Sequence, residues 1–300
     1  NYNTAHNFQN VFWKRLWDMK IDTHIIIGNH DTYFKNTNRV NAIENLYTSF
    51  DGNNEPWIYT RPKIVTLDGM DILFMPWICD DTREESIHLL DTAPVEMLMG
   101  HLEIKGVEMF NGLINQFGND KKEFRRFERV ISGHFHKHTD DGQIYYCGSQ
   151  YEMTWADYND PKGFHIFDTA TRELTRIKNP YTIHKKLIYN DKEKDYTNFD
   201  LTPYENHFVK LIVLNKTKEF VFDKLIDRLY NEINVYDLTI IEDYSDIKAS
   251  VREDILEMGE DTVTFLNNYV DQLDTKVNKV KLKEYLKSIY IEASDHSGNQ

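Results

Sequence analysis

Residues 129–136 read RVISGHFH and join an apolar run to a turn that carries two histidines. The run Arg129–Ser132 predicts a buried strand, and Gly133 predicts where it ends. Side chains alternate between the two faces of an extended chain, so His134 and His136 would point the same way. Imidazole nitrogens in that arrangement can serve two adjacent metal ions. This stretch therefore predicts a strand that ends in a metal-binding turn.

The same order of apolar run, glycine and histidine occurs twice more. Thr23–Ile27 is followed by Gly28-Asn29-His30-Asp31, and Glu96–Met99 is followed by Gly100-His101-Leu102-Glu103. Ligands of layered α/β folds collect where strands end and loops begin. Separate segments could thus converge on one site.

The segment Gly28–Asp31 offers three kinds of chemistry. The Asn29 amide can bind a metal, the His30 imidazole can protonate a leaving oxygen, and the Asp31 carboxylate can orient that imidazole. Imidazole and amide ligands suit Mn, Fe or Zn, and bridging carboxylates are also usually required in two-metal sites. Each of these histidines taken alone is more often an ordinary surface or core residue, so the set as a whole predicts the site.

The chain up to about Pro180 predicts an α/β (α+β) fold with a mixed sheet sandwich. A helix is expected at Phe8–Met19, where apolar residues recur at helical spacing. Further strands are expected at Asp71–Met75, Gln143–Cys147, Gly163–Asp168 and Glu173–Ile177.

A second, smaller unit is expected after the polar stretch Asn190–Asp200, which has the composition of a linker. Strand His207–Leu214, helix Lys218–Ile233 and strand Tyr236–Ile241 predict a βαβ-type domain. From Ser250 onward two amphipathic helices are expected. Helices of this kind after a complete α/β unit favour docking on a partner over covering the chain's own core.

Charge limits how DNA could be bound. The 300 residues include 49 acidic and 35 basic ones, which gives a formal net charge of −14. This balance argues against non-specific DNA binding through a basic surface. Divalent cations held at a site could supply local positive charge, so a phosphodiester substrate remains possible.

The two cysteines, Cys79 and Cys147, form neither a CxxC motif nor a disulfide framework, which favours a reducing, cytoplasmic environment. No apolar run approaches membrane-spanning length, and the first ten residues carry no signal pattern. We therefore expect a cytoplasmic protein without a membrane span.

Taken in order, Gly28-Asn29-His30-Asp31, His101 and Gly133-His134-Phe135-His136 resemble the later motifs of calcineurin-like metallophosphoesterases. More narrowly, Pro76-Trp77 after a strand, Gly148-Ser149 and the βαβ-plus-helices tail resemble the SbcD/Mre-type nuclease subunits of DNA double-strand-break repair complexes. Within that group, the recombination endonuclease subunits of tailed phages are the nearest in pattern. The resemblance covers nearly the whole chain.

This resemblance implies a four-layer metallophosphoesterase β-sandwich flanked by helices, with a small capping domain. It implies two divalent metal ions, Mn²⁺ or alternatively Mg²⁺. The implied metal ligands are Asn29, His101 and His134 for one ion and His136 for the other. His30 would be the catalytic imidazole, and Asp31 would orient it.

One departure from the family pattern bears on activity. The family opens with an Asp-x-His segment and a Gly-Asp-x-x-Asp segment, and neither precedes Asn29 here. Asp22-Thr23-His24 stands before its strand and is not taken as the first motif. We therefore expect an N-terminally truncated chain that lacks a bridging carboxylate and is poorly active alone, with the nuclease activity in its full-length parent.

The implied function is a Mn-dependent DNA nuclease, exonuclease or endonuclease, within an SbcCD-like recombination complex. The implied partners are DNA, an SbcC/Rad-type ABC ATPase bound through the C-terminal helices, and a second copy of the chain in a homodimer. The protein would act in the host bacterial cytoplasm if a phage encodes it. Two alternatives stay open: a small-molecule phosphodiesterase or phosphatase with the same metal core, and a non-catalytic scaffold for the ATPase.

Four parts are thus expected along the chain. They are a nuclease domain at 1–182 that lacks its first strands, a capping or DNA-recognition βαβ domain at 183–245, ATPase-binding helices at 250–292 and a disordered tail at 293–300. Trp57, Trp77 and Trp155 could stack on bases, but aromatic residues at strand ends more often pack, so none is given a role. The basic stretch Lys121–Arg129 could touch phosphates or simply be a solvated surface.

Overall fold

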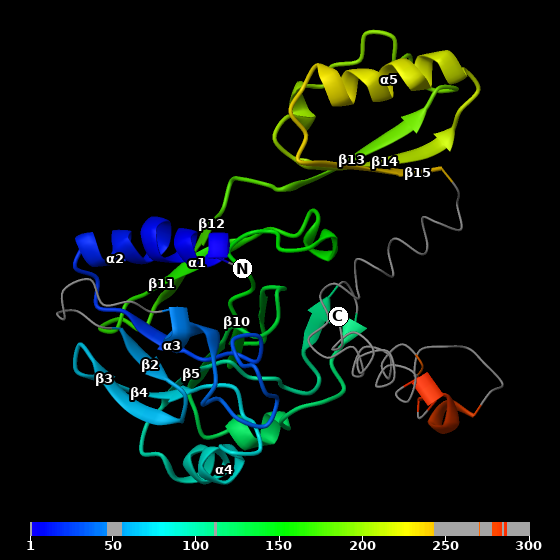
Figure 1. Ribbon diagram of the computed structural model, residues 1–300. Helices are drawn as coiled ribbons and strands as arrows, with labels where there is room; N and C mark the ends of the chain where they lie inside the picture. The colour runs from blue at the N-terminus through cyan, green and yellow to red at the C-terminus, as the bar shows by residue number, and fades with distance from the viewer. Residues whose placement is uncertain are drawn as a thin grey trace. The chain divides into compact units, whose positions relative to one another are not determined.

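The computed structural model describes residues 2–46, 56–110, 113–242, 270, 278–283 and 285–286 (Figure 1). It contains a mixed β-sheet and several helices, which confirms the predicted α/β class. The chain divides into two compact units, Asn1–Gly148 with Ile166–Thr175 and Ser149–His165 with Arg176–Gln300. The helices expected at 250–292 and the tail expected at 293–300 lie outside the described residues, apart from 270, 278–283 and 285–286.

A six-stranded sheet forms the centre of the first unit, in the order β3-β4-β5-β8-β10-β9. Its strands are β3 (Lys63–Leu67), β4 (Met70–Met75), β5 (Met97–Gly100), β8 (Arg129–Ser132), β9 (Thr139–Asp140) and β10 (Ile144–Tyr146). The four strands β4, β5, β8 and β10 are parallel neighbours, and β3 and β9 pair antiparallel with them at the two edges.

Both faces of this sheet are buried, which explains why its parallel strands are almost continuously apolar. On one face the sheet packs against α4 (Arg83–Thr92), with Leu90 of α4 in the same core cluster as Leu98 and Val130. Ile72, Phe74, Met97, Ile131 and Tyr145 line the other face. Transfer of such side chains out of water contributes about 1.5–3 kcal/mol each.

The register of the parallel strands aligns their carboxyl ends in one row. Met75 pairs with Gly100, Gly100 with Ser132, and Ser132 with Tyr146. The segments that follow the four strands therefore leave the sheet side by side at one edge.

The remaining described elements of this unit are short. They are α1 (Tyr2–Asn7), η1 (Phe8–Trp13), α2 (Lys14–Asp18), β1 (His24–Ile26), α3 (Ala42–Leu46), β2 (Trp57–Tyr59), β6 (Glu108–Phe110), β7 (Leu113–Ile114) and η2 (Lys121–Phe124). The helix expected at Phe8–Met19 is confirmed as a helical stretch, which begins earlier, at Tyr2. Strands β11 (Gly163–Phe167) and β12 (Leu174–Lys178) form the expected hairpin.

Several elements of this unit have no counterpart among the sequence predictions, including α3, β2, β6, β7 and β9 as well as β3 and α4. Strand β3 pairs with β4 through a tight turn in which Asp68 has φ 48° and Gly69 has φ 81°. An Asp-Gly pair between apolar runs is a strong hairpin signal, so this strand was recognisable. Helix α4 buries only Ser86 and Leu90, which leaves little periodic pattern to detect.

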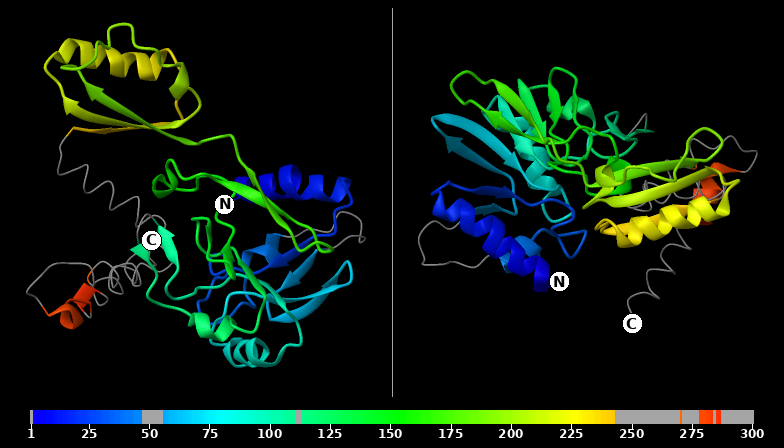
Figure 2. Two further views of the ribbon diagram at one scale, coloured as in Figure 1. Left: turned by 180° about the vertical axis from the view of Figure 1, so that it is seen from behind. Right: turned by 90° about the horizontal axis from the view of Figure 1, so that it is seen from above.

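The second unit contains a parallel three-stranded sheet, β13-β14-β15, with α5 along one face (Figures 1 and 2). The strands are β13 (His184–Asn190), β14 (Phe208–Asn215) and β15 (Asp237–Ile241), and the helix is α5 (Glu219–Asn231). Two 3-10 turns, η3 (Trp155–Asp157) and η4 (Thr202–Tyr204), also belong to this unit. Phe222, Leu225 and Leu229 of α5 pack in one cluster with Leu187, Val209 and Leu211 of the sheet.

The predicted β14-α5-β15 unit is present, but the linker prediction for Asn190–Asp200 is wrong. This stretch is a loop of the same unit, because Tyr196 is buried and its hydroxyl donates to the Ile188 carbonyl at 2.9 Å. Ahead of the loop lies β13, a strand that the sequence reading missed. Its two lysines interrupt the apolar run, although Leu187 and Tyr189 are fully buried.

Across the described ranges, no helix is both long and apolar enough to cross a membrane.

Two glycines allow a matched test of backbone packing in the first unit. Gly118 and Gly142 both have positive φ, 83° and 95°, but a Cβ at Gly118 would lie 2.1 Å from the Glu103 carbonyl oxygen, whereas Gly142 faces open space. Gly142→Ala is expected to lower the free energy of unfolding by about 1 kcal/mol. Gly118→Ala is expected to lower it by about 3 kcal/mol or more, because backbone must also move. Urea unfolding measures both, and equal losses would contradict the tight approach at Glu103.

Candidate metal centre

Three of the residues predicted to bind metal meet in space. Asn29 follows β1, His101 follows β5 and His134 follows β8. The Nε2 atom of His101 lies 2.8 Å from Oδ1 of Asn29 and 3.1 Å from Nδ1 of His134. Asn29 and His134 are buried, with exposed fractions of 1% and 2%. Three segments far apart in sequence thus present polar atoms to one point.

A single proton on His101 cannot satisfy the lone pairs of all three atoms, Asn29 Oδ1, His101 Nε2 and His134 Nδ1. If His101 Nε2 carries a proton, it can donate to Asn29 Oδ1 but cannot accept from His134 Nδ1. A cation can accept all three lone pairs at once. Metal–ligand bonds of about 2.1 Å at right angles place neighbouring ligand atoms about 3.0 Å apart, close to the two separations observed. One amide oxygen and two imidazole nitrogens therefore fit a transition metal such as Mn²⁺.

The cluster is an incomplete site in the part of the chain that is described. There, no group of three or more His, Cys, Asp or Glu side chains is placed to hold a metal ion. The donors that meet at this point are two imidazoles and one amide. The cluster of Asn29, His101 and His134 therefore fits a single metal ion that would need further ligands.

The other three predicted residues lie around this cluster. His30 is exposed, and both Asp31 and His136 are half-buried. The positive charges of His30 and His136 help to lower the pKa of His134, so both rings are close enough to act on it. The Asp31 carboxylate accepts a hydrogen bond from the Gly28 N–H at 2.7 Å, which ties it to the backbone of its own loop.

Burial controls the protonation of the site. It is the main cause that lowers the pKa of His134 to about 3, and the charges of His30 and His136 add to it. Burial likewise holds the pKa of His101 well below its usual range, with a further contribution from His134. Burial raises the pKa of Asp31, against the opposing effects of the Gly28 hydrogen bond and the charge of His30. Both central imidazoles are thus neutral at physiological pH, as metal ligands must be.

Three residues that were not predicted as site residues, Ser132, Tyr146 and Gly28, lie around the cluster and constrain it. Ser132 Oγ accepts the Leu102 N–H at 3.0 Å, and the Tyr146 hydroxyl donates to the Leu102 carbonyl at 2.8 Å. Leu102 follows His101 directly, so both bonds fix the His101 turn to β8 and β10. Gly28 matters because a Cβ there would lie 2.8 Å from Cε1 of His101. Only Gly28 carried a sequence signal, because it stands beside Asn29.

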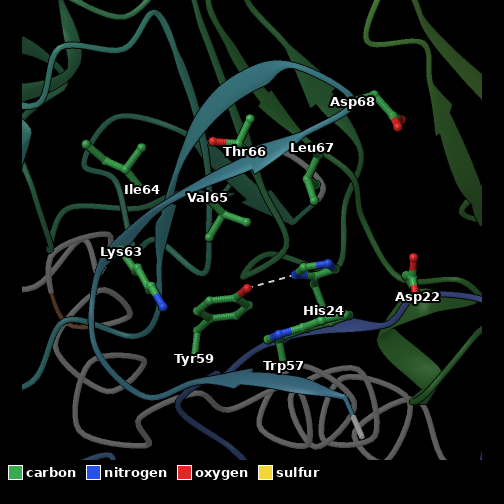
Figure 3. Close-up of a pocket in the computed structure, with 10 residues that line it drawn as sticks. All are labelled: Asp22, His24, Trp57, Tyr59, Lys63, Ile64, Val65, Thr66, Leu67 and Asp68. Atoms are coloured by element: carbon green, nitrogen blue, oxygen red, sulfur yellow. Dashed lines mark hydrogen bonds between the residues drawn. The ribbon is translucent and has the colours of Figure 1, made fainter. Parts of the chain in front are cut away.

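A separate pocket of about 670 Å³ lies between the β1-β2 pair and β3 (Figure 3). None of the six predicted site residues lines it. His24 does line it, stacked on Trp57 with ring centroids 4.6 Å apart and with Nδ1 2.8 Å from the Tyr59 hydroxyl. His24 therefore packs among aromatic residues, away from the metal ligands.

Two known proteins are similar to this chain. Exonuclease subunit 1 of Enterobacteria phage T4 is 29% identical over 284 residues, which cover 93% of this chain and 79% of that protein. The chain is homologous to this phage subunit. The SbcD subunit of the SbcCD nuclease from Staphylococcus saprophyticus is 24% identical over 183 residues, which cover 53% of this chain and 48% of that protein. No family model matches the chain.

These similarities confirm the resemblance to SbcD-type and phage nuclease subunits that the motifs predicted. The chain spans about half of the staphylococcal subunit and most of the phage one. The phage match extends along nearly the whole chain, so it includes the segments that carry Asn29, His101 and His134.

The close approach of His101 to Gly28 gives a test of the metal centre. In Gly28→Ala the new methyl group must displace the His101 ring, so Mn²⁺ affinity is expected to fall about 10- to 100-fold. Gly133→Ala is the matched control, because a Cβ at Gly133 would meet open space. Calorimetric titration with Mn²⁺ measures both. Unchanged affinity in Gly28→Ala would show that His101 does not bind the ion.

The low pKa of His134 predicts a loss of stability in acid. Below pH 6.5 the unfolded chain binds a proton at this histidine, whereas the folded protein does not until the pH approaches 3. The free energy of unfolding therefore keeps its full value above pH 6.5 and decreases as the pH falls towards 3. Between pH 6.5 and 5 the loss from this one group is about 2 kcal/mol.

Urea unfolding in EDTA at these two pH values measures the loss, with His134→Gln as the control. The variant is expected to lose correspondingly less stability than the wild type. An identical pH dependence in both proteins would contradict a buried, neutral His134.

Proposed function

We propose that this chain belongs to the nuclease subunit of an SbcCD-like complex that processes DNA ends by metal-dependent hydrolysis of phosphodiesters. The observation that carries the proposal is the cluster of Asn29, His101 and His134 within 2.8–3.1 Å, in a homologue of an exonuclease subunit. The relatives' names supply the substrate class, and the cluster supplies the place where the reaction would occur.

Each residue of the centre has a proposed part. Asn29, His101 and His134 would hold one divalent ion, and His136 would contribute to a second. Such ions supply Lewis-acid stabilisation of the charge on a phosphoryl group. The neutral state of the buried imidazoles keeps their lone pairs available for binding.

His30 is proposed to act on the leaving group. It is exposed beside the cluster, so a substrate can reach its ring. A protonated imidazole can donate a proton to a departing sugar oxygen. Asp31 would be a positioning residue: its bond to the Gly28 N–H fixes the turn that carries His30.

The charge of the protein fits a substrate held at the site rather than along a basic surface. A net charge of −14 opposes long-range attraction for DNA. Two basic residues of the stretch 121–129 are paired with carboxylates: Lys121 with Asp141 at 2.7 Å and Arg129 with Asp140 at 2.9 Å. Such pairs leave less charge for phosphate contacts, so binding at the metal centre carries the proposal.

Partner subunits are also proposed. Both relatives are named as subunits of nucleases, which supports an assembly with other chains. We propose that residues 250–292 dock on an ABC-type ATPase and that the nuclease domain forms a homodimer. These proposals rest on the sequence pattern and the relatives, because most of 250–292 lies outside the described residues.

The role of His30 is tested by cleavage of labelled linear duplex DNA with Mn²⁺, in the complete protein that the gene encodes and in residues 1–300. His30→Ala is expected to lower kcat about 100- to 10,000-fold with little change in KM, the usual contribution of a general acid. His88→Ala is the matched control, because His88 is exposed on α4 of the same unit. Mn²⁺ affinity should be the same in all three proteins.

Two results would overturn the proposal. One is DNA cleavage that persists in EDTA. The other is hydrolysis of a small chromogenic phosphodiester without DNA cleavage, even with an SbcC-like ATPase added, which would favour the small-molecule phosphodiesterase. Tight ATPase binding without any metal-dependent turnover would favour the scaffold.

A further inference from the structure

The His134 ring is held by a neighbour outside the histidine motifs. The indole of Trp77 stacks on it with ring centroids 5.4 Å apart and planes 19° from parallel. His101 meets the same ring edge-on, at 5.0 Å and 85°. Stacking fixes the plane of an imidazole, and hence the direction in which its Nδ1 lone pair points.

The backbone of Trp77 holds a second part of the site. Its N–H donates to the Ile27 carbonyl at 2.8 Å, and its own carbonyl accepts from Nδ2 of Asn38 at 2.7 Å. Ile27 and Asn38 are both fully buried, at 0% and 1% exposure. Ile27 precedes Gly28 and Asn29, so this bond fixes where the Asn29 turn begins relative to the end of β4.

We infer that Trp77 is a positioning residue of the metal centre, whose indole sets the orientation of His134 while its backbone anchors the turn of Asn29. The inference rests on the proposed function, because it assumes that these residues bind a metal ion. It gives Trp77, for which packing was the expected role, a part in the geometry of the site.

The contact depends on the flat face of the ring rather than on its N–H group. Within the described residues, Nε1 of Trp77 is buried and has no hydrogen-bond partner. A phenyl ring offers a similar face without that donor, whereas an aliphatic side chain offers no plane. Phenylalanine should therefore replace the indole in this role, and leucine should not.

Mn²⁺ binding, followed by the EPR signal of free Mn²⁺, tests the inference in the complete protein. Trp77→Leu is expected to weaken binding about 10-fold or more, the size of effect that supporting residues have on metal ligands, and Trp77→Phe to stay within about threefold of wild type. Trp57→Leu is the matched control, because Trp57 also stacks on a histidine, His24, outside the metal centre. Its affinity should not change.

Fluorescence gives a second readout, which general loss of packing would not reproduce. Bound Mn²⁺ is expected to quench part of the tryptophan emission in the wild type and in Trp57→Leu. In Trp77→Phe this quenching should be absent, although the ion still binds. Circular dichroism checks folding, and Trp77→Met replaces Trp77→Leu if the latter unfolds.

The inference is overturned if Trp77→Leu, or Trp77→Met in its place, binds Mn²⁺ as tightly as the wild type. It is also overturned if Trp77→Phe binds as weakly as the leucine variant, or if the wild type binds no Mn²⁺. Failure of the proposed nuclease is a separate result. A protein that cleaves no DNA, yet binds Mn²⁺ in a Trp77-dependent way, retains the metal centre inferred here.

Discussion

The register of four parallel strands is the constraint on which the site depends. Because Met75, Gly100, Ser132 and Tyr146 form one row, the chain segments after them start from the same edge of the sheet. A shift of one residue in any of these strands would turn its side chains to the opposite face. The buried apolar residues on both faces make that shift costly, so the core that stabilises the sheet also aligns the turns that carry His101 and His134.

The sequence predicted much of this arrangement, for physical reasons that differ between elements. Strands β4, β5, β8 and β10 were recognisable because a parallel sheet buried on both faces requires continuous apolar runs. The proposed ligands were recognisable only as a set, because three apolar runs each lead through a glycine into a segment that carries a histidine. Strand β13 was not recognisable, since its lysines break the apolar pattern.

The residues that support the proposed ligands could not be predicted from the sequence alone. Ser132 and Tyr146 act on Leu102 only because register places them beside it, and no local pattern encodes that register. Trp77 meets His134 across more than fifty positions of sequence for the same reason. Residues whose role arises from long-range pairing become visible only when the fold is known.

Main-chain atoms set the spacing of the site. The His101 N–H donates to the Met75 carbonyl, the Gly133 N–H to the Gly100 carbonyl, and the Trp77 N–H to the Ile27 carbonyl, at 2.8–3.1 Å. Such bonds survive the exchange of most side chains along the strands. Sequences that diverge widely can thus keep the same spacing, provided that a few glycines and ligands persist. A substitution along these strands can therefore leave the separation of the turns unchanged, as long as the main-chain bonds persist.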